Sequence, residues 1–299
     1  MRPLRAFEPT NLPEYLPIIQ HGGKRRIPLD APIVGVPTFK ILQWYPGSER
    51  LRPIVNSAEL LRESFRLRRD CRLILISVAK DPQIEQLWSR YRKDEIATAL
   101  RELNVEGMTV PNFSFFEDAP YIHNVWNRWR MIRVAETLSA AGIAVIPHLN
   151  ALHSTDWDYW TGYLQEHPNI RCVVKEFQTG NAKPRYAREA IASLRRLEQR
   201  LGRGLHPILV GAGFVLGEAK ASFPRFTLAD SNPFMKTVNR REFTVAVGGR
   251  RKWLPLQIEQ QVILDPLLAT NLSRYTQWVT AKQSRHFSIS EQLTLPLSA

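Results

Sequence analysis

Residues 124–147, NVWNRWRMIRVAETLSAAGIAVIP, contain a helix and a strand joined by a single glycine. The stretch from Asn124 to Ala141 predicts a helix, and Gly142 is the kind of residue that ends one. The apolar run Ile143–Pro147 follows directly and is typical of a buried strand. The segment therefore indicates a helix that packs beside a sheet, and the same alternation continues on both sides of it.

The other predicted strands are short apolar runs of the same kind. They are Ile33–Leu42, Arg72–Ala79, Gly107–Pro111, Ile170–Glu176, Pro207–Gly211, Phe226–Asp230 and Phe243–Val247. Helical stretches separate most of them, and one of these, Arg185–Leu201, is closed by Gly202. Short strands that are apolar throughout and are separated by helices indicate a parallel sheet covered on both faces.

The residues that follow these strands favour an α/β fold of the (β/α)8 TIM-like barrel type over a doubly wound open sheet. Polar or glycine residues come directly after several strands, in VPNFSFF, IPHLNAL, VKEFQTG, LVGAGF and LADSNPF. A barrel builds its active site from the carboxyl ends of several strands, whereas an open sheet gathers such residues at one crevice. We expect the barrel over residues 33–253, an N-terminal arm over 1–32, and a C-terminal helix and tail over 254–299.

The charge of the chain predicts a polyanionic partner. Its 299 residues include 41 Lys and Arg but only 28 Asp and Glu, which gives a net charge of +13. An enzyme of small metabolites has no need of this excess, but a protein that approaches phosphates does. Arginine dominates, which favours bidentate phosphate contacts. The basic residues predicted to bind nucleic acid are Arg128, Arg130, Arg240, Arg241, Arg250, Arg251 and Lys252.

The cysteine content and the absence of long apolar runs predict the cellular compartment of the protein. Cys71 and Cys172 lie far apart without a CxxC motif, which excludes a zinc site built from cysteines and argues against disulfides. No stretch approaches the roughly 20 apolar residues of a membrane span, and the N-terminus lacks the apolar run of a signal peptide. We expect a cytoplasmic protein with no membrane partner, no metal and no cofactor.

Asp230 is the strongest candidate for a catalytic residue. It ends the predicted strand FTLAD, and Ser231 and Asn232 follow it. A carboxylate at the carboxyl end of a strand, among hydroxyl and amide donors, suits a nucleophile or a metal ligand. The alternative is that Asp230 only caps the next turn, as aspartate often does.

Other residues after strands are candidates for binding a nucleobase. Glycines let the backbone approach a flat ligand closely, an amide can read the edge of a base, and an aromatic beside polar groups can stack on one. The alternatives are a tight turn for the glycines and ordinary core positions for the others. The candidates are Asn112, Phe113, Ser114, His148, Asn150, Gln178, Gly180, Gly211 and Gly213.

Two segments resemble known families. Residues 110–152, from VPNFSFF to IPHLNAL, are similar to a phage- and plasmid-borne family of unknown function with a P-[DN]-F-S motif. Residues 209–243, LVGAGFVLGEAKASFPRFTLADSNPFMKTVNRREF, resemble the late region of the queuine/guanine transglycosylases of tRNA and their DNA-modifying relatives. Those enzymes are TIM barrels that exchange guanine for a 7-deazaguanine.

The second resemblance implies roles for particular residues. Asp230 falls on the aspartate nucleophile of the family, and Phe177–Gly180 is similar to its base-binding loop. The segment whose aspartate handles protons is matched loosely by Asn112–Ser114. Asparagine cannot be a general acid, so Asp118 is the candidate replacement. The cysteine and histidine zinc ligands of the family are absent here.

The leading expectation is therefore a glycosyl transferase that inserts a 7-deazaguanine base, its co-substrate, into nucleic acid. DNA is favoured over tRNA as the polymer. Two alternatives remain open. One is a non-catalytic DNA-binding protein of a phage or plasmid. The other is a metal-dependent nuclease that uses His148, Glu176 and Asp230 as ligands.

Overall fold

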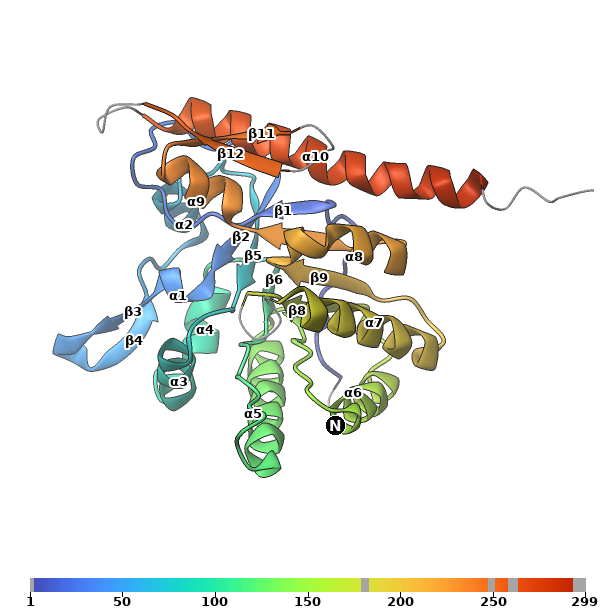
Figure 1. Ribbon diagram of the computed structural model, residues 1–299. Helices are drawn as coiled ribbons and strands as arrows, with labels where there is room; N and C mark the ends of the chain where they lie inside the picture. The colour runs from blue at the N-terminus through green and yellow to red at the C-terminus, as the bar shows by residue number, and fades with distance from the viewer. Residues whose placement is uncertain (1–2, 179–182, 247–250, 258–262, 293–299) are drawn as a thin grey trace, which may run out of the picture.

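A computed structural model describes residues 3–178, 183–246, 251–257 and 263–292, with side chains described as far as residue 281. The fold is mixed α/β, with parallel strands at the centre and helices around them (Figure 1). One parallel sheet has the order β1 (Tyr15–Pro17), β10 (Thr227–Asp230), β9 (His206–Val210), β8 (Cys172–Glu176). The other has the order β2 (Ile33–Pro37), β5 (Arg72–Ile76), β6 (Gly107–Thr109), β7 (Val145–Ile146).

Helices connect most of these strands. They are α1 (Thr38–Ile41), α2 (Ala58–Ser64), α3 (Asp81–Arg90), α4 (Ile96–Arg101), α5 (Tyr121–Ala140), α6 (Ser154–Glu166), α7 (Pro184–Leu201), α8 (Leu216–Ser222), α9 (Asn232–Val238) and α10 (Asp265–Gln292). Short 3-10 helices are η1 (Pro46–Ser48) and η3 (Ala212–Val215). Two antiparallel hairpins project from the parallel strands, β3 (Leu42–Tyr45) with β4 (Arg50–Pro53) and β11 (Arg241–Val245) with β12 (Arg251–Pro255).

Backbone hydrogen bonds also join the two parallel sheets at both of their edges. At one edge, where β1 meets β2, the Ile19 amide donates to the Gly35 carbonyl at 2.9 Å. At the other, just beyond β7, the Leu149 amide donates to the Val174 carbonyl of β8 at 3.0 Å. The Val174 amide in turn donates to the Pro147 carbonyl at 2.8 Å. Between the two sheets the pairing consists of isolated bridges, Ile18 with Gly35 and His148 with Val174.

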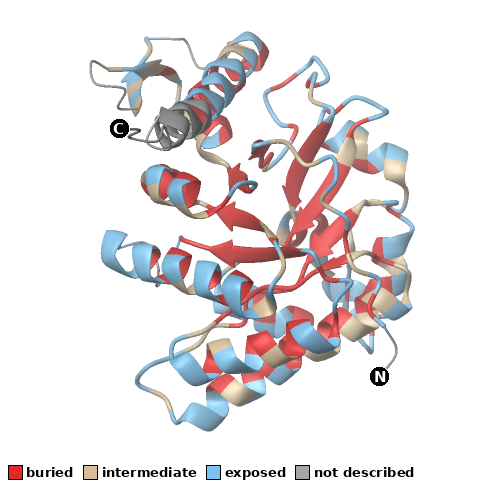
Figure 2. Cartoon of the chain, turned by 90° about the vertical axis from the view of Figure 1, so that its right-hand side faces the viewer, coloured by how far each residue is buried: buried red, intermediate tan, exposed pale blue. Residues whose placement is uncertain are grey.

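The buried apolar side chains form two separate clusters. The larger lies between the strands and the surrounding helices, whose outer faces are exposed (Figure 2). The smaller is built by alternate residues of both sheets, so the sheets share one apolar face. Its members are Phe7, Leu16, Ile18, Ile33, Ile74, Ile76, Ile146, Cys172, Val174, Ile208, Val210 and Ala229.

The N-terminal segment is part of the sheet structure. It was predicted as an arm, but β1 lies within it and pairs with β10. Upstream of β1, the Phe7 amide donates to the Val145 carbonyl at 3.1 Å. The Phe7 ring lies so close to Gly107 that a Cβ there would meet its Cδ2 at 2.5 Å. Only glycine fits at that position without displacing the ring.

Phe243–Val247 was predicted to be the last strand of the parallel sheet, and this prediction is wrong. Arg241–Val245 pairs antiparallel with β12 instead, and the eighth parallel strand is β1. Phe243 is the one buried residue of β11, while Arg241 and Val245 on the same face of the strand are exposed, so the strand lies largely at the surface. The C-terminal helix was predicted from Leu254, but Leu254 belongs to β12 and the helix begins at Asp265. The helices predicted at 124–141 and 185–201 are confirmed as α5 and α7.

Candidate functional site

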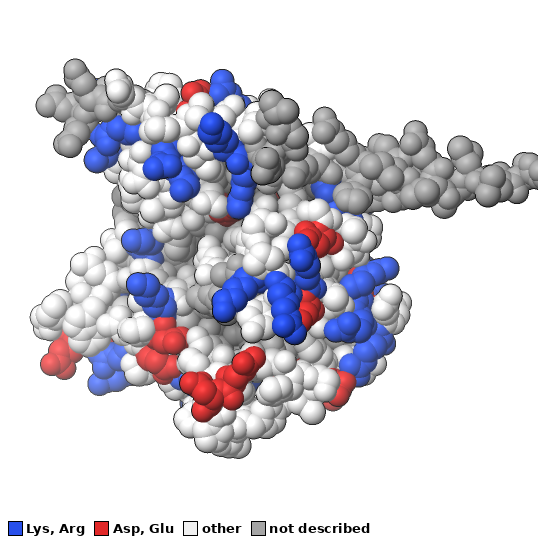
Figure 3. Space-filling view, viewed as in Figure 1, with Lys and Arg blue, Asp and Glu red and all other residues white. Residues whose placement is uncertain are grey.

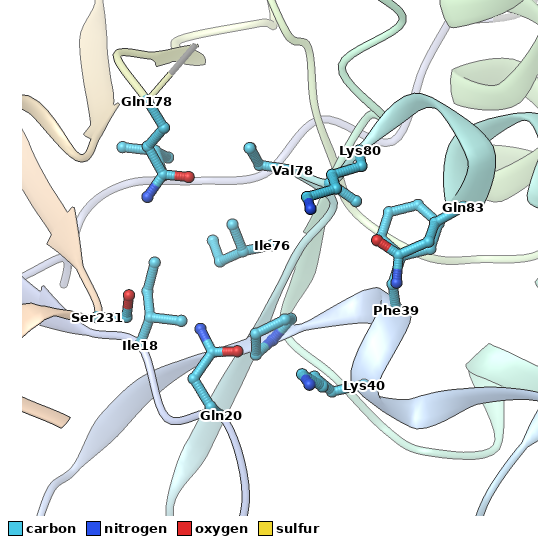
Figure 4. A pocket seen from close by; sticks show the side chains of 13 residues that line it. Ile18, Gln20, Phe39, Lys40, Ile76, Val78, Lys80, Gln83, Gln178 and Ser231 are labelled. Carbon is cyan, nitrogen blue, oxygen red and sulfur yellow. The ribbon is translucent and has the colours of Figure 1, made fainter. Parts of the chain in front are cut away.

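A cavity of about 280 Å³ opens at the carboxyl ends of the parallel strands. Its apolar lining comes from the ends of β1, β2, β5 and β9 and from the residues just after them: Ile18, Pro37, Phe39, Ile76, Val78, Ala79 and Val210. Its polar lining consists of Gln20, Lys40, Lys80, Gln83, Gln178 and Ser231 (Figure 4). This volume lies just below the usual range for small-molecule sites, about 300–1,000 Å³.

The polar lining of the cavity is cationic and neutral. Lys40 and Lys80 are exposed, and neither side chain makes a hydrogen bond or ion pair with the part of the chain that the structure describes. None of the described lining residues is acidic. Figure 3 shows Lys and Arg side chains around a hollow in this face of the molecule, with a group of Asp and Glu side chains below it and a few others elsewhere.

Asp230 ends β10 beside this cavity and is almost completely buried, at 2 % exposure. Its Oδ1 accepts a hydrogen bond from the Asn232 amide at 2.7 Å, and its Oδ2 accepts one from Asn232 Nδ2 at 2.8 Å. The first contact satisfies the beginning of α9, as the capping alternative predicts. Asp230 does not itself line the cavity, but the next residue, Ser231, does.

The second oxygen of Asp230 is also held from the C-terminal helix. The Tyr275 hydroxyl of α10 donates to Oδ2 at 2.9 Å, and Arg251 Nη1 of β12 lies 3.4 Å from the same hydroxyl. Burial, followed by the charge of Asp230, raises the pKa of Tyr275 well above its ordinary value, so the hydroxyl keeps its proton and remains a donor. The contacts of Asp230 therefore exceed what a turn cap requires.

Because Gly213 has no side chain, the groups around the Asp230 carboxylate can lie close together. A Cβ on Gly213 would lie 2.8 Å from Arg251 Nη1, 2.9 Å from the Tyr275 hydroxyl and 3.4 Å from Asp230 Oδ2. A side chain would thus push apart the groups around the carboxylate. The glycine was predicted to allow close backbone approach to a ligand, but the groups it admits are those of the protein itself.

Two of the predicted base-binding residues lie together at the cavity. Gln178 lines it and is exposed, and its backbone amide donates to Glu176 Oε2 at 2.8 Å. Gly211, with φ of 77°, lies against Gln178, because a Cβ there would meet Gln178 Cγ at 2.6 Å. The adjacent Val210 lines the cavity as well. Gly180, predicted with them, lies outside the described residues.

The predicted site residues after β6 make contacts with other residues of the protein. Asn112 is buried, and its Oδ1 accepts from the Ala79 amide at 3.1 Å. Phe113 is 1 % exposed and packs edge-on against Trp88, as the alternative of an ordinary core position predicts. The Ser114 hydroxyl donates to an Asp81 carboxylate oxygen at 2.6 Å.

Asp118, the candidate general acid, lies exposed in the loop before α5 and is not part of the cavity lining. Neither Asp118 nor Asn112, whose amide oxygen accepts from the Ala79 amide, therefore belongs to the cavity lining.

His148 and Asn150 do not face a ligand. His148 has no exposed surface, and burial, with Lys175 adding to it, lowers its pKa to about 3, so the imidazole is neutral. Asn150 is buried and its Nδ2 donates to the Phe113 carbonyl at 2.7 Å. Both residues are thus enclosed by the protein, which does not favour the prediction that they polarise a substrate oxygen.

Arg128 and Arg130 were predicted to contact phosphates, and their burial contradicts this. Arg128 pairs with the Asp156 carboxylate at 2.7 Å and lies over the Tyr159 ring at 4.1 Å. Arg130 pairs with Glu85 at 2.6 Å. Both guanidinium groups are already neutralised inside the protein, so they hold α5 to its neighbours and are not available to a partner.

The remaining basic residues predicted to bind nucleic acid lie on the segment after β10. Arg241 and Lys252 are exposed on opposite strands of the β11–β12 hairpin, and Arg240 precedes it. Arg251, on the same hairpin, reaches the Asp230 cluster. Arg250 lies outside the described residues. Of the predicted nucleic-acid contacts, these hairpin residues remain compatible with an exposed partner.

Sequence reasoning missed Tyr275, Lys40 and Lys80. Tyr275 belongs to the C-terminal helix, which begins 35 positions after Asp230, and no sequence motif connects the two residues. Lys40 and Lys80 follow β2 and β5, and the rule that polar residues after strands meet at one edge would have found them.

The described residues contain no group of three or more His, Cys, Asp or Glu side chains that could hold a metal ion. His148, Glu176 and Asp230, the ligands of the nuclease alternative, are thus not brought together. No helix within the described ranges has the length and apolar character needed to cross a membrane. Comparison with models of known protein families finds no match to the chain, and comparison with curated proteins finds none either.

Proposed function

We propose that the chain is a base-exchanging glycosyl transferase of nucleic acid, built on a closed eight-stranded parallel barrel. The barrel is supported by the backbone hydrogen bonds that link the two four-stranded sheets at both edges. It is supported further by the apolar cluster that residues of both sheets share, since the strands of a barrel fill its interior with alternate side chains. An active site at the carboxyl ends of the strands is what this architecture favours.

The observation that carries the proposal is the environment of the Asp230 carboxylate. Donors from Asn232 and Tyr275 hold it at the end of a strand, next to a cavity that contains amide and cationic groups. Hydrogen bonds of this kind fix the direction of a carboxylate. A fixed carboxylate beside a ligand cavity suits covalent catalysis on a sugar, as in the retaining glycosidases.

The proposed reaction has two displacement steps at the sugar. A carboxylate oxygen of Asp230 attacks C1′ of an unstacked guanine nucleotide, the C1′–N9 bond breaks, and guanine leaves with the bonding electrons and takes a proton from water. A 7-deazaguanine base then attacks C1′ and loses its N9 proton to water. The bond between C1′ and the Asp230 oxygen breaks, which restores the carboxylate. Because Asp230 is buried, the substrate must displace part of what covers it.

Gln178 and Ser231 are the groups of the chain best placed to contact the base. Both line the cavity, and an amide and a hydroxyl supply donors and acceptors for the polar edge of a purine. The exposed Arg241 and Lys252 on the hairpin extend the basic surface on which a DNA backbone would lie. DNA remains favoured over tRNA as the polymer.

The substitution Asp230→Asn tests the proposal. It should abolish the incorporation of a 7-deazaguanine into DNA, measured by mass spectrometry of the digested nucleosides, while the affinity for an oligonucleotide stays within about twofold. Asp118→Asn removes an exposed carboxylate and is the matched control, with activity retained. Incorporation by Asp230→Asn, or none by the wild type into DNA or tRNA, would contradict the proposal. A wild type that binds DNA without exchange would indicate a binding protein instead.

A further inference from the structure

The cavity has two chemically different sides. In Figure 4, Gln178 and Ser231 lie on one side, and Lys40 and Lys80 lie on the other, with Ile76 between them. The first side offers an amide and a hydroxyl, and the second offers two ammonium groups. A ligand that fits both must carry a neutral polar part and an anionic part.

Lys40 and Lys80 are distinguished from many other basic residues by their lack of a counterion among the described residues. Arg68, for comparison, pairs with both Asp30 and Asp70 although it lies on the surface. An ammonium group that forms no ion pair at the rim of a concave site produces a positive field, which attracts anions.

The pKa of a neighbouring histidine is affected by the same positive charges. His21 packs edge-on against Phe234, and its pKa is lowered by burial and then by Lys40, Arg25 and Lys24. The cation-rich region therefore extends from the cavity rim along the segment after β1. A cationic ligand would be repelled there, and an anionic one is favoured.

We propose that the cavity is a nucleotide subsite in which Lys40 and Lys80 bind the phosphate ester and the base lies toward Gln178 and Ser231. The guanine nucleotide named here rests on the proposed function, but the phosphate contact does not. A volume of about 280 Å³ admits a single nucleotide and excludes a duplex, so the nucleotide must enter unstacked. Its sugar, between base and phosphate, would then lie near Ser231 and thus beside Asp230.

The test compares two ligands that differ only in the phosphate. Guanosine 5′-monophosphate should bind the wild type about tenfold or more tightly than guanosine, measured by isothermal titration calorimetry, as expected for charge-assisted hydrogen bonds. The double variant Lys40→Gln/Lys80→Gln should lose this preference, with the ratio of the two dissociation constants falling close to one. Lys40→Arg/Lys80→Arg should restore it.

A matched control removes the same charge elsewhere. Lys93 and Arg101 are exposed and outside the cavity lining, so Lys93→Gln/Arg101→Gln should keep the preference for the monophosphate. A 12-nucleotide single strand distinguishes a polymer phosphate from a free one. If the polymer is the source, the cavity variant should lower the slope of log affinity against log salt by about 0.7 for each lost contact.

The outcomes separate this inference from the proposed function. An unchanged preference for the monophosphate in the cavity variant overturns the phosphate site, even if base exchange occurs. A lost preference in that variant supports the phosphate site, even if the wild type never exchanges a base. Both variants keep their exposed positions polar, and equal thermal unfolding temperatures would show that the fold is intact.

Discussion

At the scale of single residues, the Asp230 carboxylate depends on groups that are distant in the sequence. Asn232 belongs to the same turn, whereas Tyr275 is 45 positions away on α10. Tyr15, from β1, donates its hydroxyl to the Asp230 carbonyl at 3.1 Å, so the backbone of the residue is held too. Both tyrosines have pKa values well above the ordinary one, chiefly because they are buried. Two neutral hydroxyl donors thus hold Asp230, Tyr275 at its carboxylate and Tyr15 at its backbone carbonyl.

The substitution Tyr275→Phe should slow base exchange while leaving substrate binding unchanged. The loss of one hydrogen bond to a charged group corresponds to about 1.5–3 kcal/mol, or about 10- to 100-fold in kcat. The KM for the oligonucleotide should not move, because Tyr275 does not line the cavity. Tyr15→Phe is the control, since its hydroxyl bonds to the Asp230 backbone and not to the carboxylate. An equal loss of kcat in both variants would contradict a specific role for Tyr275.

The candidate site was predictable only where local sequence determines position. Asp230, Gln178 and Gly211 follow apolar strands, so their place at the carboxyl edge could be read from the strand pattern. His148 follows a strand in the same way but turns into the interior, because the direction of one side chain depends on its neighbours. Tyr275 gives no local signal, since its role arises from the packing of α10 over β1 and α9.

At the scale of elements, α5 shows why an arginine-rich helix is not by itself a nucleic-acid surface. Asp156, near the beginning of α6, has no exposed surface and accepts from Arg128 at 2.7 Å and from the Leu152 and His153 amides at 3.0 and 3.1 Å. The carboxylate therefore joins α5 to α6. Arg128 balances a charge that the fold requires at a helix N-terminus.

The substitution Arg128→Met should destabilise the protein by about 3 kcal/mol, because it leaves the buried Asp156 carboxylate without its cation. Oligonucleotide affinity should not change. Urea unfolding measures the first quantity and fluorescence anisotropy the second. Arg185→Met is the control, since Arg185 pairs with Glu189 on the surface and such pairs contribute about 0–1 kcal/mol. A loss of affinity at constant stability in Arg128→Met would support the phosphate contact that burial argues against.

Elements were predictable where the hydrophobic pattern was long and continuous. The strands around residues 72–76, 172–176 and 206–210 and the helices α5 and α7 have such patterns. The three residues of β1 lie in a proline-rich segment and are too few to show a period, so their pairing with β10 could not be foreseen. Phe243 misled the strand assignment because its ring packs against Trp253 and Tyr275 of the hairpin and helix, not within the parallel sheet.

At the scale of the whole molecule, the proposed barrel makes the N-terminal segment necessary for closure. β1 lies between β10 and the end of β2, and Phe7 belongs to the shared apolar cluster near Gly107. Without this segment, one edge of each sheet would expose unpaired backbone groups. A closed barrel and two open sheets therefore differ most at the seams, where Ile19 meets Gly35 and Leu149 meets Val174.

Native-state hydrogen exchange at the seams distinguishes the two architectures. The amides of Ile19, Leu149 and Val174 donate across the seams at 2.8–3.0 Å, and that of Gly211 donates within one sheet to Ala229 at 2.8 Å. In a closed barrel all four open only with a large part of the fold, so their protection factors should agree within about tenfold. In two open sheets the seam amides would exchange by local fraying, far faster than Gly211. Fast exchange at both seams with slow exchange at Gly211 would therefore refute closure and, with it, the single shared mouth in which Asp230 and the cavity lie side by side.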